Sequence, residues 1–421
     1  MVRLAWLRCA RWTVVILLVG SALACTPESV PAAVAQVTDR QGAGVADTGR
    51  EARVAAQVID GLFRVGPGEE VVLRGGPRSL PMLEALAVEV LAAGGKAHLL
   101  VTTDAERRYR ARELPLEYLG APPAHVDSAL ILGADLEINL PYDSDFRSIW
   151  PDLASERFQR HQRSNPILSA LNEHSTRRYL YLAMPWQPEV VAAARSQGLD
   201  SAAYATLWWA AATADIDSMA VRGVALRRQL AAAKQVRVTT PEGTDFTFTP
   251  IGRTARVDLA ALSRAAARGE SWARRQATFP AGFVTVLPVA GSATGRVRAP
   301  ANQCDQAVRD EAFELRAGRP ERVRAATDEA CVQAAVARAG AVGFLAIGLN
   351  PAMRPMLGAA GNFLPEQSRG LVTLGLGDNV RFGGTDTAPR WTVPLTRATV
   401  RVDGVAVVRD GRLLAAAASE R

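Results

Sequence analysis

The stretch TFPAGFVTVLPVAGSATGRV, residues 278–297, decides how the C-terminal half of this chain is interpreted. A turn containing Pro and Gly precedes two runs rich in β-branched residues, and this order predicts a turn followed by two strands. The residue after Gly282 is Phe283, whose ring offers no donor atom to a metal and no proton to a reaction. The stretch therefore predicts a β structure that presents an apolar ring just after its turn.

The composition is that of a folded globular protein. The chain has 421 residues, of which 48% are hydrophobic and 22% charged, so it is long enough for two packed domains. The formal net charge is +7, but the basic residues are spread along the sequence without interleaved stacking aromatics. This charge indicates a solvated surface, and nucleic-acid binding is not expected.

The N-terminus has the pattern of an export signal. Residues 1–25 contain a basic start, an apolar run over 12–23 and small residues before Cys25. Either Cys25 is lipidated and anchors the mature N-terminus to a membrane, or the signal is cleaved at an A-x-A site. An uncleaved anchor helix is the third alternative. Residues 26–48 would form a tether, and the expected location is the periplasm or the outer envelope, as a lipoprotein.

Two cysteines remain for the folded part of an exported chain. Because export places the protein in an oxidising compartment, Cys304 and Cys331 either form a disulfide or remain two buried thiols. Two cysteines are too few for a Cys-based zinc site.

Periodicity divides the rest of the chain into two domains. Residues 50–234 contain a strand, an amphipathic helix and a further strand in the order of a βαβ unit, and end in a long helical region broken near residues 215–217. These features predict an α/β domain with a mostly parallel sheet. Residues 235–421 alternate in period two between Gly turns, with one helix near 328–340, and predict a β-rich domain.

Several segments in a fixed order resemble the M29 metallo-aminopeptidases, the aminopeptidase T family, over residues 50–415. They are VGPGEEVVLRG, the helices of 199–234 running into VRVTTPEGTDFTFTPIGR, FPAGFVTVLPVAGSATGRV, FLAIGLNPAM, GLVTLGLGDNVRFGG, PRWT and DGVAVVRDGRLL. The resemblance implies an N-terminal α/β domain, a C-terminal β-rich domain that carries the active site, and a homodimer that encloses a cavity. It also implies two divalent metals bridged by a water, held by carboxylates and imidazoles.

The first three positions at which the family pattern has a metal ligand carry other residues here. The pattern has a Glu after the Gly of the first motif, where this chain has Phe283. A second Glu precedes the A-x-G-x-N segment (346–350), where this chain has Phe344, and a His of the pattern corresponds to Thr373. Two apolar rings and a hydroxyl therefore replace two carboxylates and an imidazole.

The remaining family positions differ in the same way. A His and an Asp flank a Trp in the pattern, whereas Arg390 and Thr392 flank Trp391 here, and the catalytic Tyr of the pattern corresponds to Val380. A guanidinium at a ligand position repels metal ions. Arg390 either reaches solvent or binds a carboxylate of a neighbouring residue or a ligand.

A count of donor residues gives the same expectation without the resemblance. The histidines are His98, His125, His161 and His174, so the β-rich domain has no imidazole. His161 and His174 are expected at the surface. Three acids lie near the motifs, on expected turns, and leave open a carboxylate-only Ca²⁺ or Mg²⁺ site: Glu366, Asp378 and Asp386. Asp378 is expected to form a turn.

The sequence thus predicts an exported, aminopeptidase-like protein that is catalytically inactive, binds no metal or cofactor and has a binding or assembly role. Expected partners are a peptide or an envelope protein, a second copy of the chain, and a membrane through Cys25. The alternatives are an active leucyl-type metallo-aminopeptidase with a rearranged metal site, using His98 or His125 with Asp378, and a purely structural envelope protein.

Overall fold

The computed structural model describes residues 48–196, 198–304, 307–354 and 365–414. The described residues belong to one compact unit. The export signal and Cys25 lie outside them, and so does the expected tether except for its last residue. Within these ranges, no helix combines the length and apolar character that a membrane crossing requires.

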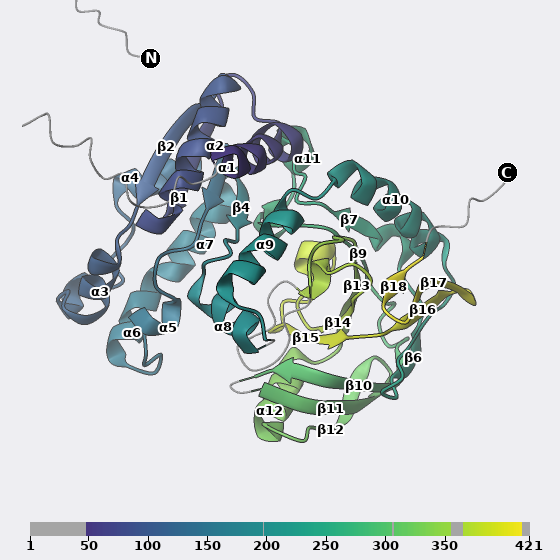
Figure 1. The fold of residues 1–421 in the computed structure, drawn as a ribbon. Helices are drawn as coiled ribbons and strands as arrows, with labels where there is room; N and C mark the ends of the chain where they lie inside the picture. The colour runs from purple at the N-terminus through teal and green to yellow at the C-terminus, as the bar shows by residue number, and fades with distance from the viewer. Residues whose placement is uncertain (1–47, 197, 305–306, 355–364, 415–421) are drawn as a thin grey trace, which may run out of the picture. The chain divides into compact units, whose positions relative to one another are not determined.

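The first part of the chain folds around a parallel sheet of five strands (Figure 1). Its order is β2-β1-β3-β4-β8, and every neighbouring pair is parallel. This arrangement confirms the expected α/β class. The strands are β1 (Glu70–Gly75), β2 (Lys96–Val101), β3 (Leu136–Asn139), β4 (Arg178–Leu182) and β8 (Gln276–Phe279).

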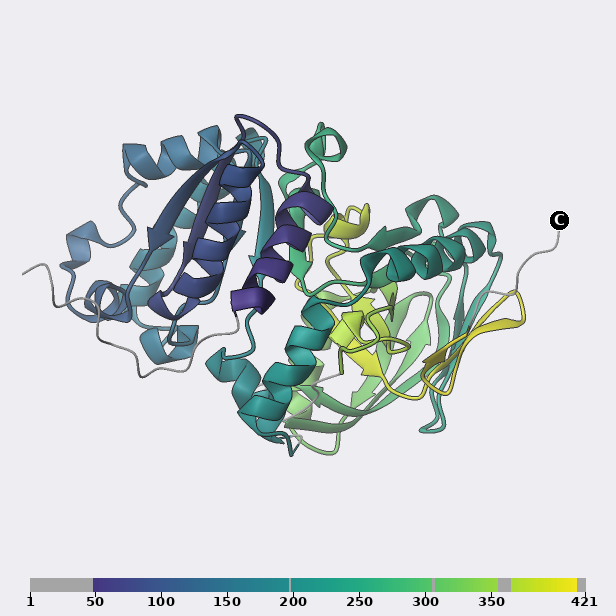
Figure 2. The same ribbon diagram turned by 45° about the horizontal axis from the view of Figure 1, so that its top comes forward.

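Helices pack on both faces of this sheet, whose first strands are drawn in blue in Figure 2. Crossover helix α2 buries Met82, Leu83, Leu86 and Val90, which recur at helical spacing. The helices of this part of the sequence are α1 (Thr48–Ala56), continued by a π-helical turn (Gln57–Phe63), α2 (Leu80–Ala92), α3 (Asp104–Arg112), α4 (His125–Gly133), α5 (Phe146–Ile149), α6 (Glu156–His161), α7 (Asn165–His174), α8 (Pro188–Ser196), α9 (Ser201–Ala212) and α10 (Ile216–Ala232). Helix α10 packs on the second part of the chain instead of on this sheet.

The second part contains two antiparallel sheets. The larger has the order β12-β11-β10-β6-β5-β16-β17-β18. Its strands are β5 (Val236–Thr239), β6 (Asp245–Phe248), β10 (Thr294–Gln303), β11 (Ala307–Arg316), β12 (Arg319–Arg324), β16 (Thr399–Val402), β17 (Val405–Arg409) and β18 (Arg412–Leu413).

The smaller antiparallel sheet, called the third sheet below, has the order β15-β14-β13-β9-β7. One apolar core unites side chains of both antiparallel sheets with α10 and α12. The strands of the third sheet are β7 (Arg256–Asp258), β9 (Phe283–Val286), β13 (Val342–Gly348), β14 (Val372–Leu376) and β15 (Trp391–Leu395), and the helices of this part are α11 (Arg264–Ala267) and α12 (Glu329–Ala339).

The two halves of the sequence are not independent. Strand β8 lies beyond residue 235, yet it pairs with β4 in the parallel sheet. The chain then passes a cis Phe279–Pro280 peptide and Gly282, at φ +128°, and enters β9 of the third sheet. The stretch 278–297 thus contains the end of one strand, all of β9 and the start of β10, so its expected leading turn is partly strand.

Helix α4 covers residues 127–133, and the strand that follows it is short, Leu136–Asn139. One local expectation needs correction. The β-rich half contains α11 as well as the expected helix near 328–340. The expected break in the 199–234 helical region lies at residues 213–215, where the Asp215 carboxylate accepts the N–H of Ser218, 3.1 Å away.

Candidate functional site

The strand residues at the positions suggested by the resemblance lie on one face of the third sheet. In its register, Phe283 is opposite Gly348, and Phe344 is opposite Gly375. Thr373 is opposite Ala346, and Thr392 is opposite Gly375. Residues that face each other across antiparallel strands point to the same side, as do alternate residues along one strand. Phe283, Phe344, Thr373 and Thr392 therefore share one surface.

The two phenylalanines build an apolar cluster on this face together with Phe382. The ring centre of Phe382 lies 4.5 Å from that of Phe344 and 6.2 Å from that of Phe283, the latter in an edge-to-face arrangement. The exposed fractions are 1% for Phe283, 2% for Phe344 and 4% for Phe382. Aromatic rings therefore occupy this part of the sheet surface, at contact distances typical of packed aromatic pairs.

Glycine on the neighbouring strand makes room for Phe344. A Cβ atom added to Gly375 would overlap three carbon atoms of the Phe344 ring. The ring thus lies directly over the backbone of β14, at a place where any side chain would displace it.

Arg390, which immediately precedes β15, completes the cluster. Its Nη2 lies 2.7 Å from Oδ2 of Asp378, and its Nε donates to the Asp378 carbonyl at 3.2 Å. The guanidinium carbon is 5.4 Å from the ring centre of Phe344 and 5.2 Å from that of Phe382. Of the alternatives left open for Arg390, the structure thus shows binding to a neighbouring carboxylate, together with stacking on rings, by a residue that is also exposed to solvent.

Asp378 forms the turn that holds this part of the site. Its carboxylate also accepts the backbone N–H of Val380 at 3.0 Å, as expected for a turn-forming aspartate. Val380 begins the short 3₁₀ helix η8 (Val380–Phe382), which brings Phe382 over the third sheet. Asp386 similarly accepts the N–H of Ala388 at 2.9 Å. Both carboxylates thus serve the local backbone.

Two buried hydroxyls on the same face have no partner among the described residues. Thr285 and Thr373, both opposite Ala346, have exposed fractions of 1% and 0%. Neither Oγ1 makes a hydrogen bond in the described structure. At the six positions suggested by the resemblance, threonine hydroxyls and a guanidinium are the only polar side-chain groups, and these residues do not fit a pair of divalent cations.

Two carboxylates near this face are paired with arginines. Arg381 Nη2 lies 3.0 Å from Asp258 Oδ2, and Arg390 holds Asp378. Glu366, in the 3₁₀ helix η7 (Pro365–Gln367), has its pKa raised by burial, although the charges of Arg381 and Arg390 act in the opposite direction. Asp258, Arg381 and Phe382 were not predicted from the sequence, although the alternation in β7 is a signal that places Asp258 on this face.

In the described part of the chain, three metal-ligating groups approach one another within 4.8 Å only at Cys304, Asp328 and Cys331. The two sulfur atoms there are joined in a disulfide, with Cα atoms 6.1 Å apart, so they are not thiolate ligands. Among the residues described, Glu366, Asp378 and Asp386 do not gather in this way.

The four histidines belong to the first part of the chain. His98 Nε2 lies 2.6 Å from Glu70 Oε2, and His125 begins α4 at the surface. His174 is exposed, as expected. His161 is half-buried and stacks on Trp150 with ring centres 4.8 Å apart, so it lies only partly at the surface, and burial lowers its pKa.

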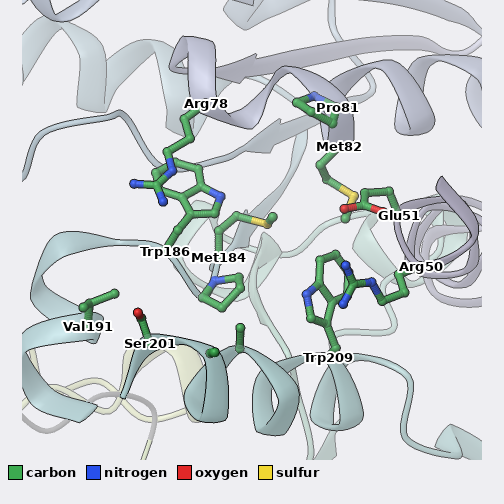
Figure 3. A pocket seen from close by; sticks show the side chains of 13 residues that line it. Arg50, Glu51, Arg78, Pro81, Met82, Met184, Trp186, Val191, Ser201 and Trp209 are labelled. Atoms are coloured by element: carbon green, nitrogen blue, oxygen red, sulfur yellow. The ribbon is translucent and has the colours of Figure 1, made fainter. Parts of the chain in front are cut away.

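A cavity lies in the first part of the chain, away from the third sheet (Figure 3). It has a volume of about 440 Å³, a size typical of small-ligand pockets, and lies where β4 ends and α2 begins. The guanidinium carbon of Arg78 lies 5.0 Å from the ring centre of Trp186, and that of Arg50 lies 5.1 Å from the ring centre of Trp209. Met82 and Met184 line the wall between them. We call this cavity the aromatic pocket.

Comparison of the sequence with protein-family models and with curated proteins finds no match. Solved structures do match. AmpT from Thermus thermophilus superposes with a TM-score of 0.62 at 17% identity, over 87% of this chain and 99% of AmpT. The chain has an AmpT-like fold.

A second solved structure shares the AmpT-like fold. It is 2,5-dihydroxypyridine dioxygenase from Pseudomonas putida KT2440, with a TM-score of 0.54 and 15% identity, over 87% of this chain and 98% of the dioxygenase. AmpT is an M29 aminopeptidase, so the fold agrees with the resemblance. Because an aminopeptidase and a dioxygenase share it, the fold alone assigns no activity.

Proposed function

We propose that this chain is an exported, catalytically inactive AmpT-like protein with a binding or assembly role in the cell envelope. The observation that carries the proposal is the cluster of Phe283, Phe344 and Phe382 on the face of the third sheet where the resemblance places metal ligands. A two-metal peptidase needs oxygen and nitrogen donors at one point, so that the ions polarise the scissile carbonyl and generate a hydroxide. Packed rings supply neither.

The charges near the rings support the proposal. Arg381 and Arg390 lie next to Phe382, and each already holds one carboxylate, Asp258 and Asp378 respectively. A divalent ion at this face would be repelled by guanidinium groups, which remain protonated under all ordinary conditions. It would also compete with them for the carboxylates.

The aromatic pocket is the best candidate for the binding role. Two indole faces and two thioethers give it apolar walls, while the guanidiniums of Arg50 and Arg78 lie at its edges. We propose that it accepts a small ligand with an apolar body, such as part of a peptide.

The cellular setting is part of the proposal and rests on the sequence and the resemblance alone. We propose that the mature chain is anchored through lipidated Cys25 and forms a homodimer. A Cys25→Ala substitution should then move the protein from the membrane fraction to the periplasmic fraction. Retention of the Cys25→Ala protein in the membrane fraction would contradict lipid anchoring.

An activity assay tests the central part of the proposal. The full-length purified protein is incubated with leucyl-p-nitroanilide and with zinc or cobalt, with AmpT from Thermus thermophilus as the positive control. We expect no release of p-nitroaniline above the buffer rate. Metal-dependent turnover that a chelator abolishes would instead support the alternative of a rearranged metal site.

A ligand screen tests the binding role. Peptides are screened by thermal shift against the wild-type protein and against Ala205→Phe, which places a ring in the aromatic pocket. The control is Ala210→Phe on the same helix, at an exposed position that does not line the pocket. A hit should bind the wild type and the control but not Ala205→Phe; a hit that binds all three proteins equally would place the site elsewhere.

A further inference from the structure

A half-buried arginine on the third sheet, Arg256, forms no ion pair with any described residue. Arg256 lies on β7 opposite Thr285 of β9, on the same face as the phenylalanine cluster. Its Nη1 atom is inaccessible to solvent and has no hydrogen-bond partner in the described structure. Among the described residues, no carboxylate lies within ion-pair distance of Arg256, whereas Arg274 and Arg381 each have one. A buried guanidinium without a partner is strongly disfavoured.

The groups around Arg256 are also incompletely satisfied. Arg381 pairs with Asp258 at 3.0 Å and Arg274 pairs with Glu270 at 2.7 Å, but the Nε atom of each is buried and has no partner among the described residues. The unpartnered hydroxyl of Thr285 belongs to the same group. Three guanidiniums and a hydroxyl thus offer unused donors, whereas among the described residues only two carboxylates, Asp258 and Glu270, form ion pairs with these arginines.

The donors surround a small cavity. It has a volume of about 50 Å³ and is lined by β7 and β9 residues together with Arg274, Arg381 and Phe382. A single water needs on the order of 10–15 Å³, so the cavity has room for a few waters or for one carboxylate- or phosphate-sized group. Water could accept hydrogen bonds from the donors, but it would not neutralise the excess charge.

We propose that this cavity, called the oxyanion pocket below, binds a small oxyanion, either a carboxylate or a phosphate group, with Arg256 as its principal partner. The planar guanidinium suits two parallel hydrogen bonds to two oxygens of one group. The Thr285 hydroxyl donates a further hydrogen bond from the neighbouring strand. The inference adds a second binding site to the proposed binding function and rests on that function for its biological meaning.

Electrostatics at the pocket favour occupation by an anion. Burial lowers the pKa of Arg256, the charges of Arg274 and Arg381 lower it further, and Asp258 and Glu270 oppose this effect. A bound anion would offset both the burial and the repulsion between the guanidiniums. Because the pocket carries a net positive charge, it also selects against metal cations.

Anion binding by the full-length protein is measured by thermal shift and calorimetry, at constant ionic strength in chloride. Sodium phosphate and sodium acetate form separate arms that distinguish phosphate from carboxylate. We expect a saturable rise in the melting temperature in one arm. Arg256→Met should weaken the apparent affinity at least tenfold, because it removes the principal charge. The matched control is Arg227→Met at an exposed position on α10, which should bind as the wild type does.

A second variant separates binding from folding. Thr285→Val keeps the shape of the side chain and removes only the hydroxyl, and we expect about fivefold weaker binding from the loss of one hydrogen bond. Equal binding by the wild type and Arg256→Met, or no saturable effect of either anion, would overturn the inference. Neither result depends on peptidase activity or metal content, so failure here is distinguishable from failure of the proposed function.

Discussion

The ring of Phe344 on β13 lies over the backbone of Gly375 on β14, in the space that a β-carbon at residue 375 would occupy. The same ring contacts Phe382 and carries the Arg390 guanidinium near its face. Gly375 and Phe344 thus together fix the position of the phenylalanine cluster on the third sheet.

The first prediction is a coupled loss of stability at these two residues. Gly375→Ala should destabilise the protein by about 1–3 kcal/mol, because the ring must leave its position. Phe344→Ala should cost about 3–5 kcal/mol through lost packing. Urea unfolding of the double variant should show a loss of stability smaller than the sum of the two single losses, because the alanine at 375 has room once the ring is gone. Strictly additive losses would contradict the overlap.

The second prediction concerns restored carboxylates. Phe283→Glu combined with Phe344→Glu should lower stability by more than about 3 kcal/mol, because two carboxyl groups would be buried in the place of two packed apolar rings. Added zinc should not recover the lost stability, since Thr373, Arg390 and Thr392 supply no imidazole or carboxylate. Thermal melts with and without zinc test this, with Phe283→Gln and Phe344→Gln together as the uncharged control. A zinc-dependent rise specific to the Glu pair would show that the site can be rebuilt.

The third prediction is a pH dependence that arises from Glu311 on β11. This residue is fully buried, and burial raises its pKa from 4.5 to about 7. The Trp391 indole donates to one carboxyl oxygen at 2.8 Å and the Asn302 amide to the other at 2.6 Å, which partly offsets the shift.

Because the folded-state pKa of Glu311 lies above the unfolded value, the folded protein binds the extra proton between these pH values. The contribution of protonated Glu311 to the free energy of unfolding is complete below about pH 4.5 and is lost as pH rises through about 7. The loss amounts to roughly 3 kcal/mol. Urea unfolding of Glu311→Gln from pH 4.5 to 8 should lack this slope. An unchanged slope in the variant would assign the pH dependence to other groups.

The fourth prediction concerns the disulfide between Cys304 and Cys331, which closes a loop between residues 27 positions apart. Replacing both cysteines by alanine should cost about 3 kcal/mol in the loop-entropy account. Peptide mapping of the non-reduced protein should recover the linked pair. Equal stability of the wild type and the double variant, or recovery of free thiols at both positions, would contradict the bond.

Much of the fold follows from the sequence because the signals are local. Alternation in β14 and β15 predicts strands, and the apolar spacing of Met82, Leu83, Leu86 and Val90 predicts α2. The membership of β8 in the parallel sheet could not be predicted in this way. A four-residue strand carries no signal for its distant partner, and the choice depends on how the chain turns after Phe279.

The candidate site could likewise be predicted only in part. The expected positions Phe283, Phe344 and Thr373 share a face because strand register brings them together. That Arg256 forms no ion pair among the described residues is not visible in the sequence, because it results from which side chains are buried and which carboxylates pair elsewhere. Phe382 was missed because it comes from a short 3₁₀ helix without periodicity.

The most direct test of the central claim is the metal content of the purified full-length protein. The protein is dialysed against zinc and cobalt, and then against metal-free buffer, before elemental analysis, with AmpT from Thermus thermophilus treated in parallel. We expect this chain to retain far less than one equivalent of either metal, because rings and guanidiniums occupy the face where donors would be needed. About two equivalents per chain, retained through dialysis and lost on chelation, would contradict the account.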